Sequence, residues 1–202
     1  MRMTAKIFLD TCSIIALSGL KEKEEFDLLR NRLEECKSGL YASHIQGDEM
    51  HPEELSDFRE IYEKAFEKFE KHGIKIHWEE PTRGMIVGVS RIGFCRILKD
   101  DLVKIAEELE EENRKCMEER RRFEENAEQQ KIVLNLAKDC LIATTSLDYD
   151  YFITSDKCLY DSWNKILERH KTEKILEKTS EVVYAQPSPT IILKEILKIL
   201  NS

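Results

Sequence analysis

The sequence predicts an α/β fold with three layers, α/β/α: a central, mainly parallel sheet covered by helices on both faces, plus one long helical insertion. Two observations support this. Short, uninterrupted apolar runs, typical of strands buried on both faces, occur at residues 7–9 and 151–154. Segments with helical spacing of apolar residues lie between such runs, and this alternation of strand and helix is typical of a parallel sheet.

The first half of the chain contains three predicted strands. The predicted elements are, in order, a strand at 5–10, helical spacing from Ile14 to Leu17, a helix at 24–37, a strand at 40–42, a charged amphipathic helix at 53–72 and a strand at 74–78. Gly39 is expected to end the helix at 24–37, because glycine commonly follows the last helical residue. Residues 79–98 fit either strand or helix and stay unassigned.

The second half begins with one predicted helix over residues 99–130. At about 1.5 Å per residue it would exceed about 40 Å, too long to lie on a small domain. We therefore expect it either to project as a helical arm or to break near Asn113. The later elements are an apolar helix at 131–147, a strand at 151–154, a helix at 157–170, a strand at 182–184 and a helix at 190–200 that Pro189 opens.

The composition bounds the domain organisation and the partners. The 202 residues are enough for one hydrophobic core, so we expect a single domain over 1–202 with an inserted helical or irregular region at about 73–130. The formal charge of -8 argues against bulk binding to a polyanion, and a nucleic-acid partner would need a local basic patch. No signal peptide or membrane span is visible, so we expect a cytoplasmic protein without a membrane partner.

The cysteines show neither the spacing of a zinc ribbon nor that of a disulfide scaffold. Most fall within apolar runs or predicted helices, so we expect buried, free thiols in a reducing compartment. The six positions are Cys12, Cys36, Cys95, Cys116, Cys140 and Cys158.

Acidic residues follow the predicted strands. Asp10 and Asp156 each come after a buried strand, and the carboxyl ends of strands are where ligands bind in open α/β sheets. Taken alone, Asp10 is better explained as the N-cap of the next helix. Glu49 follows the strand at 40–42, and Asp139 lies in an apolar helix, where aspartate is rarely buried without a partner.

These four acids are expected to meet, because the carboxyl ends of parallel strands share one edge of a sheet. Two like charges about 4 Å apart repel by roughly 4 kcal/mol at an effective dielectric constant near 20. Such a cluster needs a divalent cation, and ligands that are all oxygen favour Mg²⁺ or Mn²⁺ over zinc.

Four segments of the chain resemble the acidic motifs of PIN-domain ribonucleases, a family that includes VapC-like toxins and stand-alone PIN proteins. The resemblance covers residues 5–50 and 131–170. The segments are KIFLDTCSIIAL, ASHIQGDEM, LAKDCLIATTS and DYFITSDKCL, in that order along the chain.

The resemblance implies a metal-dependent endoribonuclease that hydrolyses phosphodiester bonds of single-stranded or structured RNA with one or two Mg²⁺ or Mn²⁺ ions. The implied catalytic residues and metal ligands are Asp10, Glu49, Asp139 and Asp156. Thr154 would line the site, and Thr11 and Ser13 would support the loop around Asp10. Asp48 is the alternative ligand to Glu49, and Asp161 is either an outer acid or an exposed helix residue.

Basic residues at the rim would offset the repulsion between an acidic site and phosphate. The candidates are Arg83, Arg91, Arg96, Arg120, Arg121 and Arg122. The last three form the only tight basic triplet, which is better explained by exposed pairing with neighbouring glutamates.

The resemblance also implies a homodimer and, for a toxin, an antitoxin-like protein inhibitor. The length favours a stand-alone or RNA-processing nuclease over a toxin. Two other interpretations remain open: a catalytically inactive PIN-like module that binds RNA or protein, and a different α/β metal-dependent phosphatase or nuclease. The filled acidic positions make us prefer the enzyme.

Overall fold

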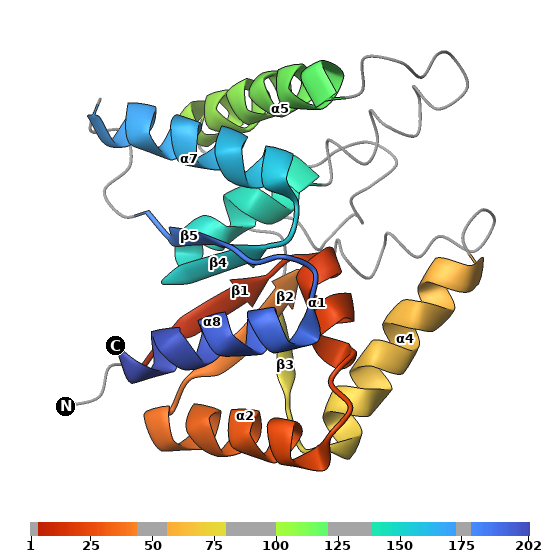
Figure 1. The fold of residues 1–202 in the computed structure, drawn as a ribbon. Coiled ribbons are helices and arrows are strands. Elements are labelled where there is room, and N and C mark those ends of the chain that lie inside the picture. Colours follow the sequence, from red (N-terminus) through yellow and green to blue (C-terminus); the bar gives the residue numbers. More distant parts are fainter. Residues whose placement is uncertain (1–3, 44–55, 80–99, 121–138, 173–178) are drawn as a thin grey trace.

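The computed structural model describes residues 4–43, 56–79, 100–120, 139–172 and 179–202 (Figure 1). In these residues five strands form one sheet, in the order β3-β2-β1-β4-β5, and every neighbouring pair is parallel. The predicted three-layer α/β/α fold is therefore confirmed. The strands are β1 (Lys6–Leu9), β2 (Gly39–Ser43), β3 (Ile76–Glu79), β4 (Tyr151–Thr154) and β5 (Glu181–Tyr184).

Helices cover both faces of the sheet. In Figure 1, α2 and α8 lie on one side of the strands, and α5 and α7 lie on the other. The helices are α1 (Thr11–Ser18), α2 (Lys23–Cys36), α4 (Ser56–Lys71), α5 (Asp100–Arg120), α7 (Lys157–Thr172) and α8 (Pro189–Asn201). Residues 139–145 are also helical and lead into the short 3-10 helix η1 (Ser146–Asp148).

The central strand explains why its sequence is apolar throughout. Ile7 and Leu9 are fully buried in the core cluster that includes side chains of α1, α2 and α8. Phe8 points to the opposite face and packs with side chains of α5, α7 and residues 140–149. Since successive side chains of a strand alternate between faces, a strand covered on both sides requires apolar residues at every position.

The order of the strands reverses beside β1. From β1 the chain builds outward through β2 and β3, and it then returns to the other side of β1 with β4 and β5. The carboxyl ends of β1 and β4 therefore flank the point where the direction changes. In open α/β sheets the crevice outside those ends is the usual ligand site.

Helix α5 differs from the expectation for a free arm. It is continuous from Asp100 to Arg120, without a break at Asn113, and it packs along α7. Ile105 and Leu109 are fully buried in the core, and Glu108 accepts from Arg169 of α7 at 2.9 Å. The prediction of a projecting arm is therefore wrong for residues 100–120. β3 and α5 both fall within the region 73–130 where the sequence predicts an insertion, and both pack as parts of the fold.

The end of α2 also differs from the prediction. Lys37 itself takes the left-handed conformation, with φ 52°, and its N–H bonds to the Glu34 carbonyl at 3.0 Å. Ser38 N–H bonds to the Leu33 carbonyl at 2.9 Å. These bonds already close the helix, so Gly39 starts β2 instead, where a Cβ would meet the Tyr41 ring at 3.0 Å.

The described cysteines are not all buried. Cys36, Cys140 and Cys158 are buried and Cys116 is half-buried, but Cys12 is exposed on α1. None of these is in a disulfide, and Cys95 lies outside the described residues. Within the described parts of the chain, no helix has the length and apolar character needed to cross a membrane.

Candidate metal site

Asp10 lies at the carboxyl end of β1, where the chain enters α1. Its backbone N–H extends the β1–β4 ladder by donating to the Ile153 carbonyl at 3.1 Å. Its Oδ1 accepts the backbone N–H of Ser13 at 2.6 Å, so the side chain caps α1. The capping role expected for Asp10 is therefore present.

The second oxygen of Asp10 has a role that capping does not explain. Oδ2 accepts the Thr154 hydroxyl at 2.6 Å and the Ser155 backbone N–H at 3.0 Å. Both donors belong to the end of β4, across the point where the strand order reverses. The carboxylate is thus fixed between two adjacent strand ends, with its plane set by bonds to both.

Burial dominates the electrostatics of Asp10. The residue is 5% exposed, and burial raises the pKa of its carboxyl, while the hydrogen bonds from Ser13, Thr154 and Ser155 oppose the rise. Among the described residues no basic side chain offsets its charge. A buried carboxylate without a cation partner is unfavourable when ionised, and a bound cation would relieve that cost.

Two serines connect α1 to the end of β4. The Ser13 and Ser155 hydroxyl oxygens lie 3.1 Å apart. The Ser13 hydroxyl also donates to the Ile153 carbonyl oxygen at 3.4 Å. The structure therefore places Ser13 and Thr154 beside Asp10, where the resemblance expects them, and Thr11 is buried in the first turn of α1. Ser155 also contacts Asp10 and Ser13 and belongs to the candidate site, although the motifs did not single it out; its place directly after Thr154 could have indicated it.

Asp156 is held in the same loop cluster. Its backbone N–H donates to the Thr154 hydroxyl oxygen at 3.1 Å, so one hydroxyl connects Asp156 to Asp10. Its Oδ1 accepts the Leu159 N–H at 3.0 Å and caps α7. Its Oδ2 makes no hydrogen bond within the described parts of the chain, which leaves it available to a ligand.

Asp139 begins the helical residues 139–145. The buried side chains of this segment pack on the sheet face that carries Phe8 and Phe152. Among the described residues Asp10, Asp139 and Asp156 do not gather into a group of three that could hold a metal ion, so the structure does not bring Asp139 together with the other two acids in that way. Burial raises the pKa of the neighbouring Cys140 thiol, and the charges of Asp139 and Glu110 add to that rise.

Several expected site residues cannot be placed. Glu49 and its alternative Asp48 lie outside the described residues. The same is true of Arg83, Arg91, Arg96, Arg121 and Arg122. Arg120 is the last residue of α5, and its side chain lies outside the described part. Asp161 is exposed and pairs with Lys157 at 2.6 Å.

The donor chemistry fits a hard divalent cation. Asp10, Thr154 and Asp156 offer only oxygen atoms, which suits Mg²⁺ or Mn²⁺. Within the described residues, no three His, Cys, Asp or Glu side chains gather closely enough to hold a metal ion. The fit to a metal ion therefore rests on the buried Asp10 carboxylate and on Asp156 Oδ2, which has no hydrogen-bond partner among the described residues.

Comparison of the chain with protein-family models, with curated proteins and with solved structures found no match.

Proposed function

We propose that this chain is a PIN-type endoribonuclease that hydrolyses RNA with Mg²⁺ or Mn²⁺. One observation carries the proposal: Asp10 and Asp156 stand at adjacent strand ends where the strand order reverses, and the Thr154 hydroxyl connects them. A buried carboxylate such as that of Asp10, at the crevice outside the strand ends, is typical of a ligand site and not of a structural core.

Four acids would hold the ions: Asp10, Glu49, Asp139 and Asp156. A bound ion of this kind lowers the pKa of a coordinated water and stabilises charge on a leaving oxygen. The chain's own contribution is orientation. Three hydrogen bonds prevent the Asp10 carboxylate from rotating, so no reorganisation is needed when charge develops at the phosphate.

Single-stranded RNA is the preferred substrate, because a flexible strand can bring its phosphate into a recessed acidic site. We also propose, from the family resemblance, a homodimer and an inhibitor protein if the chain acts as a toxin. A cytoplasmic location belongs to the same proposal.

A second candidate is a PIN-like module that binds RNA or protein without cutting. One observation favours it: the Asp10 and Asp156 side chains both cap helices, so each residue has a structural reason to be present without any metal. The enzyme remains our preferred conclusion, since capping does not explain the hydrogen bonds that Asp10 Oδ2 accepts from Thr154 and Ser155.

The test is cleavage of an end-labelled single-stranded RNA with Mn²⁺ and with EDTA. Asp10→Asn and Asp156→Asn should each lower the rate about 10²–10³-fold, as loss of one charge-stabilising group typically does. The matched control is Asp148→Asn, since Asp148 is exposed beside the amino end of the same β4. Cleavage that EDTA does not inhibit, or equal rates for Asp10→Asn and Asp148→Asn, would overturn the proposal.

A further inference from the structure

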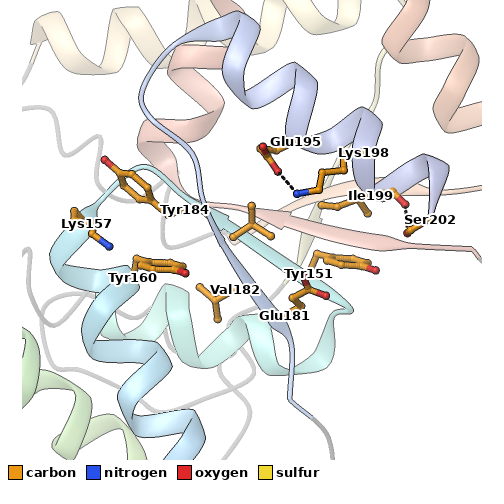
Figure 2. Close-up of a pocket in the computed structure, with 11 residues that line it drawn as sticks. Tyr151, Lys157, Tyr160, Glu181, Val182, Tyr184, Glu195, Lys198, Ile199 and Ser202 are labelled. Carbon is orange, nitrogen blue, oxygen red and sulfur yellow. Dashed lines mark hydrogen bonds and ion pairs between the residues drawn. The ribbon is translucent and has the colours of Figure 1, made fainter.

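A groove of about 530 Å³ lies along β5, the edge strand of the described sheet (Figure 2). Its two ends differ in character. Lys157, Tyr160 and Tyr184 gather at one end, which we name the aromatic end. Tyr151 and Glu181 lie at the other. The volume is within the range of small-ligand sites, which are typically 300–1,000 Å³.

The aromatic end adjoins the candidate metal site. Tyr184 pairs in register with Thr154, the residue whose hydroxyl donates to Asp10. Neighbouring strands lie about 4.8 Å apart, so Tyr184 and Thr154 stand side by side at the same sheet edge. Lys157 directly follows Asp156 in the chain and begins α7. A ligand in the aromatic end is therefore next to the acids.

The rings of the aromatic end are arranged for contact with a flat ligand. The Tyr160 and Tyr184 ring centroids are 5.7 Å apart and the rings are tilted by 51°, so they form an open wedge and do not stack on each other. Both residues are only partly buried. The Lys157 ammonium lies over both rings, 4.5 Å from the Tyr160 centroid and 5.1 Å from that of Tyr184, so a cation already contacts the ring faces and a base entering the wedge would displace it sideways.

This combination matches a nucleobase with its phosphate. Stacking of a base on an aromatic side chain stabilises single-strand binding by about 1–3 kcal/mol and does not depend on sequence. Lys157 can exchange its partner, because its pair with Asp161 is exposed and such pairs contribute about 0–1 kcal/mol. Along the rest of the groove Glu195 pairs with Lys198 at 3.6 Å, and Glu181 adds a second carboxylate. The net charge of that part is therefore negative and disfavours a phosphate backbone there, so the aromatic end is the better place for the polyanion.

We infer that the aromatic end binds one unpaired nucleobase of a single-stranded RNA, with the adjoining phosphate against Lys157. The inference rests on the ribonuclease function proposed above and names a subsite for its substrate. A paired base cannot enter the wedge without leaving its stack, so the subsite selects single-stranded over duplex RNA. The subsite would also help a chain of net charge -8 to bind RNA, because Lys157 supplies a local positive charge and base stacking does not depend on charge.

Fluorescence anisotropy of a labelled oligouridylate, measured in EDTA at low salt so that nothing is cleaved, tests the inference. Tyr184→Leu should weaken binding about 5- to 150-fold, the equivalent of one lost stack, while Tyr184→Phe keeps the ring and should bind as the wild type does. Lys157→Gln should lower the slope of log affinity against log salt by about 0.7, the value for one phosphate on a single strand. The matched control is Tyr151→Leu, at the far end of the same groove, which should leave binding unchanged.

Three results would overturn the inference. The first is no binding of the oligonucleotide up to about 100 µM, the weak limit of non-specific binding. The second is equal affinity of the wild type and Tyr184→Leu. The third is an equal loss from Tyr151→Leu and Tyr184→Leu, which would show that the loss is not specific to the aromatic end.

The inference and the proposed function fail separately. Ring-dependent binding without Mn²⁺-dependent cleavage would keep the subsite and reject the nuclease. Cleavage that Tyr184→Leu leaves unchanged, together with unchanged binding, would keep the nuclease and reject the subsite.

Discussion

Thr154→Val tests the connection between the two candidate acids. Valine has nearly the same shape, but it removes the hydroxyl that donates to Asp10 Oδ2 at 2.6 Å and accepts from the Asp156 N–H at 3.1 Å. A hydrogen bond to a charged group contributes about 1.5–3 kcal/mol. The Asp156 N–H left without a partner costs about 1 kcal/mol more, the low end of the range, because Asp156 is half-exposed.

The expected loss in the free energy of unfolding is therefore about 3 kcal/mol. For a chain of this size, 1 kcal/mol corresponds to about 2–4 °C, so the melting temperature in EDTA should fall by about 6–12 °C. Urea unfolding monitored by circular dichroism gives the free energy directly.

Thr144→Val is the matched control. Thr144 is as fully buried as Thr154, but its hydroxyl donates only to neutral carbonyls of its own helix, those of Cys140 at 2.9 Å and Leu141 at 3.1 Å. We expect a loss of about 1 kcal/mol. A double-mutant cycle of Thr154→Val with Asp10→Asn should give a coupling energy above about 1 kcal/mol. Equal losses in both threonine variants, with no coupling, would refute the proposed role of the hydroxyl.

Three further predictions concern stability. Burial raises the pKa of Asp10, so the folded state holds this proton more tightly than the unfolded state. Asp10 therefore favours the folded state most below the ordinary carboxyl pKa, and this contribution should disappear as pH rises through the raised pKa. In the wild type, the melting temperature in EDTA should therefore fall between acidic and neutral pH. Asp10→Asn should remove the part of this pH dependence that comes from Asp10. Cys116 and Cys158 have their sulfurs 2.6 Å apart, so hydrogen peroxide should take two electrons and two protons from them, release water and leave a disulfide. Closing this 42-residue separation should stabilise the chain by about 4 kcal/mol, measurable as a rise in melting temperature that dithiothreitol reverses. Asn113 is fully buried and neither polar atom of its side chain has a partner in the described residues, so Asn113→Leu should stabilise the fold by about 1–2 kcal/mol in urea unfolding.

Each of these predictions has a contradicting result. A pH slope that is identical in wild type and Asp10→Asn would show that Asp10 titrates normally. Peroxide that leaves both thiols free to react with a thiol reagent after unfolding, or a Cys116→Ser variant that gains the same stability on oxidation, would exclude the disulfide. A destabilised Asn113→Leu would show that the amide has a partner in solution.

Local sequence patterns could predict the elements in which burial follows a simple rule along the element. The run Ile7–Leu9 is apolar at every position because both faces of β1 are covered, and that requirement is visible without knowing what covers them. The stripe of α2 was predictable for the same reason, since Phe26 and Leu29 are both buried.

Contacts between distant segments were not predictable in this way. Glu108 and Glu112 look like a solvated charged face in the sequence, but they pair with Arg169 and Lys165 of α7. Helix α5 therefore packs on the fold and does not project from it. The spacing of charges within one helix carries no information about a partner more than 50 residues away, as the 53-residue separation of Lys165 and Glu112 shows.

Part of the candidate site was likewise predictable from the sequence, and part of it was not. That Asp10 and Asp156 follow strands was visible in the sequence. That Thr154 and Ser155 bind the second oxygen of Asp10 depends on the register of β1 against β4, which no local pattern specifies. The register therefore had to come from the structure.

The most direct test of the acidic metal site is thermal melting of the wild type and Asp10→Asn, each with and without Mn²⁺. Metal at 100 times its dissociation constant should add about 2.7 kcal/mol to the wild type, a rise of about 5–11 °C. Asp10→Asn should remain folded and lose most of that gain, whereas Asp148→Asn should retain it. Mn²⁺ that leaves the melting of the wild type unchanged would contradict the metal site and make the non-catalytic module the leading account.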